Sequence, residues 1–133
     1  MKSYTDLEQS KKLAEILPIE SADMYYFTII RDYPYSQGKI KTIAKIMDGS
    51  FSSNYDTPCW SLAALLGVLP TTIGNFFEKN ALRIRMDKGE NDFNIWYENF
   101  DCGDVAEGLD VREGNPIDAC YEMIVKLHEQ NLL

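Results

Sequence analysis

The spacing of hydrophobic and polar positions predicts three helices. A capping-box pattern at residues 5–8 precedes apolar residues at helical spacing, which predicts a helix over residues 6–17. The run 60–69 is nearly all apolar and follows Thr57-Pro58, a pair typical of an N-cap and a first-turn proline. It therefore predicts a central helix that is covered on more than one side. Asn115-Pro116 predicts the start of the last helix in the same way. The buried stripe of that helix is expected to comprise Ile117, Cys120, Tyr121, Ile124 and Leu127.

Two pairs of segments between these helices have the patterns of β-hairpins. Residues 24–31 are rich in aromatic and β-branched side chains, and residues 39–47 largely alternate between apolar and polar. A helix over 39–47 is the alternative, but an antiparallel hairpin is favoured. Residues 81–87 and 92–100 also alternate, around a short turn, and give the clearest hairpin pattern in the chain. Residues 101–114 are acidic and glycine-containing, so we expect them to be mostly loop.

The order helix, hairpin, helix, hairpin, helix indicates an α+β protein. The chain has 133 residues, close to the commonest domain size, so we expect a single domain over residues 1–133. The simplest architecture is a small antiparallel sheet of four strands with the helices packed on one face.

The composition is that of a globular protein. Hydrophobic residues make up 45% of the chain and aromatic residues 12%, which argues against disorder. The longest apolar stretch, around residues 61–69, is far shorter than the ~20 residues that a membrane span needs, and no signal-peptide pattern is visible. The three cysteines, Cys59, Cys102 and Cys120, are odd in number and widely spaced, as expected in a reducing compartment. A cytoplasmic location is therefore expected.

The negative charge is concentrated in one part of the chain. The formal net charge is −8, and residues 87–118 carry all of it, because the basic and acidic residues elsewhere balance. Through much of this stretch an acidic residue recurs at every third position. These residues are Glu98, Asp101, Asp104, Glu107, Asp110 and Glu113.

Several interpretations of the acidic stretch are open. A solvated loop is the commoner outcome for such a composition. A docking surface for a basic partner protein is the functional alternative, with Trp96 as a hydrophobic anchor beside the carboxylates. A calcium site is weaker, because the stretch lacks the alternating ligands and closing glutamate of the common calcium loop.

A second set of charged residues lies on the predicted hairpins. Lys39, Lys41 and Lys45 alternate along the first hairpin, and Arg83 and Arg85 alternate along the second. If both hairpins share one sheet, these side chains form a basic face that could bind single-stranded nucleic acid. The net charge of −8 opposes such binding at long range, so nucleic acid is the less favoured partner.

The residue types that carry common catalytic chemistry are not grouped along the chain. His128 is the only histidine, and Cys120 precedes it by eight residues in the same predicted helix, about 12 Å away along the axis. Cys59 could meet His128 only through the fold. No CxxC, HxxxH or phosphate-binding glycine motif is present, so we expect no metal and no cofactor.

Three blocks of the sequence resemble a group of small proteins carried by prophages and mobile elements of gut bacteria. The blocks are Tyr4–Tyr26, Pro58–Pro70 and Asn115–Leu133, which together cover under half of the chain. The resemblance implies a bacterial or phage cytosolic setting. It favours an accessory or host-interaction protein over a housekeeping enzyme, and it implies no activity, cofactor or catalytic residue.

From the sequence we therefore expect a non-enzymatic interaction protein that binds a basic host or phage protein. Nucleic-acid binding by the hairpin lysines and arginines is the alternative, and an enzyme whose site no motif marks is the third possibility. A protein with a basic face and an acidic stretch can also bind a second copy of itself. The expected partner-binding residues are Trp96, Asp101, Asp104, Glu107, Asp110 and Glu113.

Overall fold

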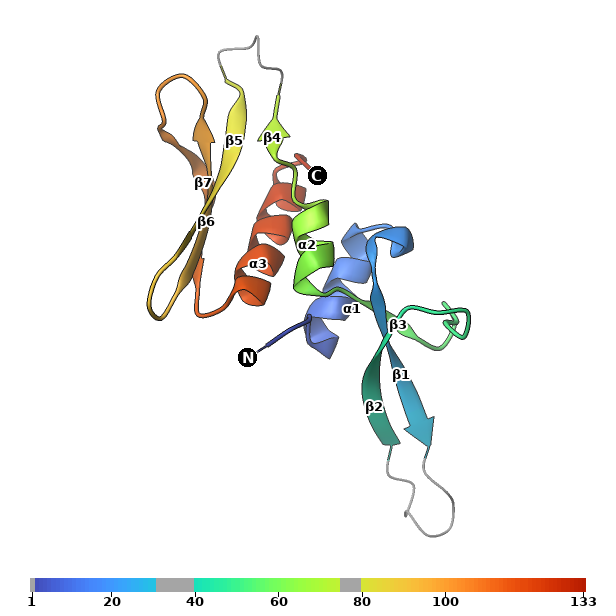
Figure 1. Ribbon diagram of the computed structural model, residues 1–133. Helices are drawn as coiled ribbons and strands as arrows, with labels where there is room; N and C mark the ends of the chain where they lie inside the picture. Colours follow the sequence, from blue (N-terminus) through green and yellow to red (C-terminus); the bar gives the residue numbers. More distant parts are fainter. Residues whose placement is uncertain (1, 31–39, 75–79) are drawn as a thin grey trace.

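The computed structural model describes residues 2–30, 40–74 and 80–133 (Figure 1). Within these residues, the predicted helices and hairpins follow one another in the expected order. The elements are α1 (Leu7–Ile16), the 3-10 helix η1 (Ile19–Ser21), β1 (Met24–Ile30), β2 (Ile40–Ile46), β3 (Thr57–Cys59), α2 (Leu62–Val68), β4 (Thr72–Ile73), β5 (Leu82–Lys88), β6 (Phe93–Asn99), β7 (Val105–Glu113) and α3 (Pro116–Glu129). The strands β3, β4 and β7 are additional to those predicted.

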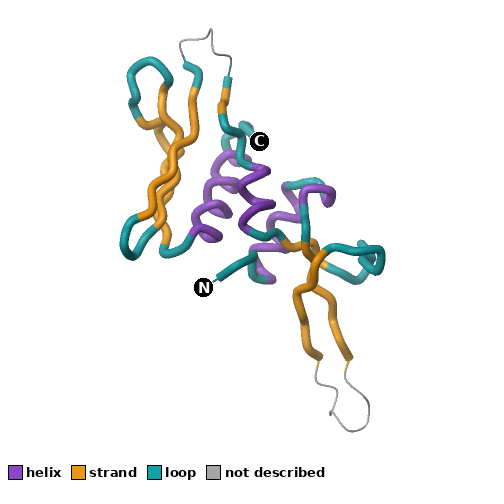
Figure 2. Tube along the Cα trace, viewed as in Figure 1, coloured by secondary structure: helices purple, strands orange, loops and turns teal. Residues whose placement is uncertain are grey.

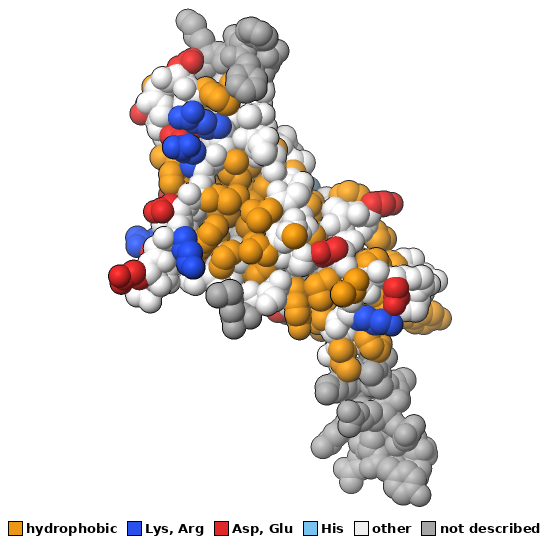
Figure 3. Space-filling view, viewed as in Figure 1, with side chains coloured by type: hydrophobic (Ala, Val, Ile, Leu, Met, Phe, Trp, Pro, Cys, Tyr) orange, Lys and Arg blue, Asp and Glu red, His pale blue; other side chains and the backbone are white. Residues whose placement is uncertain are grey.

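The strands form two antiparallel sheets. One has the order β2-β1-β3 and the other the order β4-β5-β6-β7. The helices lie between the two sheets, with α3 packed against β6 and β7, and α1 against β3 (Figures 1 and 2). Figure 3 shows hydrophobic side chains gathered in the middle of this face, where Figure 1 places α2 and α3. The α+β class and both predicted hairpins are confirmed. The prediction of a single four-stranded sheet is wrong, because the two hairpins lie in separate sheets, where β1 also pairs with β3, β5 with β4, and β6 with β7.

The helix α1 confirms the prediction for the first helix, but its cap lies one residue later than expected. Asp6 is the N-cap: its carboxylate accepts the Gln9 N–H at 2.8 Å, and its own N–H donates to Gln9 Oε1 at 3.1 Å. Thr5 is fully buried, where its hydroxyl lies 2.7 Å from Ser10 Oγ and accepts the N–H of Trp60. The Thr5 hydroxyl is therefore used in the core, where an unpaired polar group is costly.

The predicted start of the central helix at Thr57-Pro58 is wrong. These residues belong to β3, where Pro58 lies opposite Tyr25 at the edge of the three-stranded sheet. An edge strand tolerates proline because the missing N–H interrupts no ladder there. The helix α2 begins only after Ser61, whose hydroxyl accepts the Ala64 N–H. Leu65 is its one fully buried residue and the opposite side is open to solvent, so α2 is not enclosed on several sides.

The expected acidic loop contains the strand β7. Leu109 and Val111 are buried against α3, whereas Asp110 and Arg112 between and beside them are exposed. This alternation of buried and exposed residues extends over only a few positions, so the surrounding glycines and acidic residues obscure it in the sequence. The pairing with β6 is irregular near Gly108, which has a φ of 75° that favours glycine.

The last helix forms as predicted and supplies the largest part of the core. Asn115 caps α3 by accepting the Asp118 N–H, and Pro116 occupies its first turn. Every predicted stripe residue is fully buried except Tyr121, which is partly buried. The helix packs between the four-stranded sheet and α2, and the fully buried side chains at this junction include Ile117, Met123, Ile124, Leu127, Ile95, Tyr97 and Leu65.

Candidate functional site

The structure places four of the predicted acidic residues at one edge of the four-stranded sheet. Asp101 and Asp104 lie in the connection between β6 and β7, and Glu107 and Asp110 lie on β7, the edge strand. All four side chains are exposed, and none forms an ion pair with another described residue. These four residues are referred to below as the acidic edge. Among the described residues, the Lys126 ammonium donates to the Asp110 backbone carbonyl at 3.0 Å but forms no ion pair with the four carboxylates, so their charge is available to a partner.

Trp96 borders the acidic edge but is not freely exposed. On β6 it lies opposite Asp110 of β7 on one side and Arg85 of β5 on the other. Its neighbours Ile95 and Tyr97 are fully buried on the face toward α3, so Trp96 belongs to the outer face of the sheet. Its side chain is partly buried there, between an anion and a cation.

The two outer acids of the predicted series do not join the acidic edge. Glu113 ends β7 opposite Phe93 and is half-buried. Glu98 lies on β6, where its Oε1 accepts a hydrogen bond from Arg83 Nε at 3.3 Å and forms an ion pair with Arg85 Nε at 2.8 Å. The charge of Glu98 is therefore neutralised within the sheet, and the acidic edge is smaller than the sequence predicts.

The predicted basic residues are divided between the two sheets. Lys39 lies outside the described residues, and Lys41 is on β2 of the three-stranded sheet. Lys45 of the same strand pairs with Asp48 at 3.0 Å. Arg83 and Arg85 are on β5 of the other sheet, so the shared basic face expected from the sequence does not form. Nucleic-acid binding remains an alternative prediction. Its candidate cations lie in two separate sheets, and ion pairs with Asp48 and Glu98 partly neutralise them.

The cluster around Lys45 is held together by Asp48. The Asp48 carboxylate accepts from Ser50, from Lys45 and from the Tyr25 hydroxyl, and these contacts hold the pKa of Asp48 below its ordinary value. The Lys45 ammonium also lies 5.9 Å from the centre of the Phe27 ring. This cluster fixes the segment after β2 against the hairpin.

Cys59 belongs to a buried polar cluster rather than to a reactive site. Its thiol lies 3.6 Å from Thr5 Oγ1 and 3.5 Å from the Thr5 carbonyl oxygen, and Tyr26 donates to the same carbonyl. Burial raises the pKa of the Cys59 thiol, although a hydrogen bond with Thr5 works against the shift. A raised thiol pKa disfavours the thiolate that nucleophilic chemistry requires.

The other candidate nucleophile is also without a base. Cys120 is fully buried in α3, and burial raises the pKa of its thiol to about 12. His128 is exposed near the end of the same helix, and its side chain forms no hydrogen bond with either buried cysteine within the described residues. The described part of the chain also contains no cluster of three or more His, Cys, Asp or Glu side chains placed to hold a metal ion.

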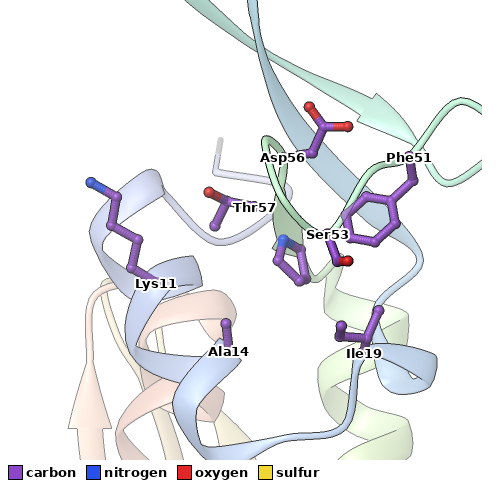
Figure 4. A pocket seen from close by; sticks show the side chains of 8 residues that line it. Lys11, Ala14, Ile19, Phe51, Ser53, Asp56 and Thr57 are labelled. Atoms are coloured by element: carbon purple, nitrogen blue, oxygen red, sulfur yellow. The ribbon is translucent and has the colours of Figure 1, made fainter.

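Sequence reasoning did not identify a cavity between α1 and the segment that precedes β3 (Figure 4). Its volume is about 280 Å³. The lining residues come from α1, η1 and residues 51–58, which are far apart in the sequence and carry no shared motif. Only the packing of these segments creates the cavity.

Comparisons with protein families, with curated proteins and with solved structures give no match for this chain. In the described residues, no helix combines the length and the apolar character that a membrane crossing requires.

Proposed function

We propose that this chain is a non-enzymatic protein that binds a basic partner protein through its acidic edge. The supporting observation is the exposure of four carboxylates, at Asp101, Asp104, Glu107 and Asp110, on one edge strand and its adjoining connection, without an internal counter-ion among the described residues. A partner with clustered lysine and arginine side chains complements this surface. Unpaired surface charge of one sign chiefly accelerates the association of such a partner.

Trp96 supplies the hydrophobic part of the proposed interface. It lies opposite Asp110 on the outer face of the sheet and is partly exposed there. Tryptophan is enriched among residues that dominate binding energy, and a charged rim around an aromatic centre is common in protein interfaces. In line with the resemblance to prophage and mobile-element proteins, we take the partner to be a protein of a bacterial host.

The test compares association rates of charge variants. The tagged protein captures binding proteins from a nuclease-treated bacterial lysate, and a purified basic binder then serves for kinetic measurements at low and moderate salt. The triple variant Asp104→Asn, Glu107→Gln and Asp110→Asn is expected to associate about tenfold more slowly at low salt, with little change in dissociation. The difference should shrink as salt screens the charges.

A matched variant removes three carboxylates elsewhere. Glu8, Glu15 and Glu20 are exposed on α1 and η1, and replacing each with Gln lowers the net negative charge by the same amount. This control should associate at nearly the parent rate. If both triple variants slow association equally, net charge acts without a defined surface. If neither does, the carboxylates of β7 serve only to protect an edge strand from self-association, and the proposal is wrong.

A further inference from the structure

The cavity of Figure 4 is lined by apolar side chains, by the hydroxyl-bearing residues Ser53 and Thr57, and by one charged side chain of each sign. Ala14 of α1, Ile19 of η1, Phe51 and Pro58 provide the apolar surface, while Lys11 and Asp56 provide the two charges. A volume of about 280 Å³ lies at the lower end of the range for ligand pockets, so the cavity suits a small molecule rather than a large cofactor.

Asp56 is held in a fixed position through one of its two carboxylate oxygens. Its Oδ2 accepts the Ser52 N–H at 2.8 Å, which ties the carboxylate to its own loop. No other described residue donates a hydrogen bond to Oδ1 of this carboxylate. A carboxylate held in this way beside an apolar surface is an acceptor for an ammonium group.

Lys11 is available at the other side of the cavity. Its only ion-pair partner within the described residues is Glu8, at 3.8 Å, a distance at the limit of an ion pair. The side chain is 57% exposed and flexible enough to reach an anionic group that enters the cavity. The margin of the cavity therefore carries a hydrogen-bond acceptor for a cationic group, Asp56, and a donor for an anionic group, Lys11.

The neighbouring cavity explains why a ligand with a carboxylate would choose this side of Asp56. A second cavity of about 260 Å³ also touches Asp56 and is lined by Tyr25, Phe27 and Lys45. There the Lys45 ammonium already lies beside the Phe27 ring. On that side Lys45 is already paired with Asp48 at 3.0 Å, whereas Lys11 in the cavity against α1 has only the 3.8 Å contact with Glu8 among the described residues and can turn toward a ligand carboxylate.

We propose that the cavity between α1 and residues 51–58 binds an apolar α-amino acid as its zwitterion. The ammonium group of the ligand contacts Asp56, its carboxylate contacts Lys11, and its side chain rests on Ile19, Phe51 and Pro58. Each half of the ligand matches one feature of the cavity, and its size matches the volume. This site lies apart from the acidic edge and is independent of the function proposed above.

Binding is measured by NMR titration of the isotope-labelled protein with L-phenylalanine, up to about 20 mM because a ligand of this size binds weakly. Saturable shifts at residues around the cavity are expected. Two truncated ligands separate the charge contacts: phenethylamine lacks the carboxylate, and 3-phenylpropanoate lacks the ammonium. Each should bind about tenfold more weakly than the amino acid.

Two variants test the two charged residues. Asp56→Asn keeps an oxygen that can accept the Ser52 N–H, so the loop is expected to hold while affinity falls about tenfold. Lys11→Gln should cause a similar loss, selectively for ligands that carry a carboxylate. Asp87→Asn and Lys88→Gln, on exposed residues of β5, are matched controls that should leave affinity unchanged.

Any one of three results would overturn the proposal. The first is that L-phenylalanine causes no saturable shifts at the cavity, and the second is that phenethylamine and the amino acid bind with equal affinity. The third is that the Asp56→Asn variant, shown by thermal unfolding to be folded, binds with unchanged affinity. The triple variant of the acidic edge is expected to bind the amino acid normally. Failure of one proposal can therefore be told from failure of the other.

Discussion

Arg85 Nε lies 2.8 Å from Glu98 Oε1 across the β5–β6 pair, and the Glu98 side chain is only 11% exposed. Arg83 Nε approaches the same oxygen at 3.3 Å. One nearly buried carboxylate therefore pairs with two arginines on the outer face of the sheet and offsets half of their charge. This relationship removes Glu98 from the acidic edge and weakens the basic character of the two arginines.

Glu98→Gln is expected to lower the free energy of unfolding by about 1 kcal/mol, because it removes the charge shared by Arg83 and Arg85, which are themselves partly screened by solvent. Urea unfolding followed by circular dichroism measures the change. Glu107→Gln is the matched control, because Glu107 is exposed and has no ion pair with another described residue, and it should shift stability by less than about 0.5 kcal/mol. Equal effects of the two substitutions would show that the Glu98 pairs contribute nothing.

The contact between the N-terminal segment and α3 should make stability sensitive to acid. Burial tends to raise the pKa of Asp118, but hydrogen bonds from Lys2, Gln9 and Asn115 outweigh it, and the pKa lies below its ordinary value of 3.8. A carboxylate with a lowered pKa in the folded state stabilises the protein above the unfolded pKa. That contribution is lost as the pH falls from about 4 through the folded value.

Asp118→Asn is therefore expected to be less stable than the parent at pH 7, by about 1 kcal/mol. The difference should narrow below about pH 4, where the Asp118 carboxylate of the unfolded parent takes up a proton while that of the folded parent still resists protonation. The stability difference between the variant and the parent is tested by thermal unfolding at intervals of about one pH unit from about pH 3 to about pH 7. A constant difference at every pH would mean that the charge of Asp118 does not stabilise the fold.

The three cysteines should differ sharply in reactivity. Cys102 is exposed, whereas Cys59 and Cys120 are buried and burial raises the pKa of both thiols. With a disulfide reagent at pH 8, one thiol is expected to react quickly and two only as fast as the protein opens. Cys102→Ser should abolish the fast phase. A fast phase that survives this substitution would contradict the buried positions of the other two cysteines.

Two glycines should respond in opposite directions to substitution by alanine. Gly108 has a φ of 75°, and an added Cβ would lie 2.9 Å from the Gln130 amide nitrogen, so Gly108→Ala should destabilise the protein by about 1–2 kcal/mol. Most of this cost is backbone strain, since the Gln130 side chain can move. Gly67 is exposed in α2 with open space around it, and Gly67→Ala should stabilise by about 0.5–1 kcal/mol. Urea unfolding of both variants checks the signs.

The elements with strong local patterns could be predicted from the sequence. The helices α1 and α3 and the β5–β6 hairpin have sustained periods and clear ends, such as Asn115-Pro116 before α3. Segments with weak or mixed patterns could not. The strand β7 has only two fully or nearly buried residues, Leu109 and Val111, among charged neighbours, and Pro58 has the local features of a helix start although it lies in β3.

The candidate surface was only partly predictable for the same reason. The sequence identified where the acids are concentrated, but not which of them would be neutralised. Glu98 acquires two arginine partners through the register of β5 and β6, while Asp110 and Glu107 acquire none among the described residues. Cross-strand register depends on pairing between distant residues, and a list of charges does not contain it.

The sequence by itself determined the α+β class, the helix–hairpin alternation and the acidic character of residues 87–118, because each depends on composition or on neighbours within one or two turns of the chain. The tertiary structure decided the rest. It divided the strands into two sheets with the helices between them. It also left four carboxylates of β7 and the β6–β7 connection without an ion pair among the described residues, and it created the cavity beside Asp56. These features depend on long-range packing, because local sequence preferences do not distinguish between the possible arrangements of the elements. The burial of apolar faces favours one of those arrangements.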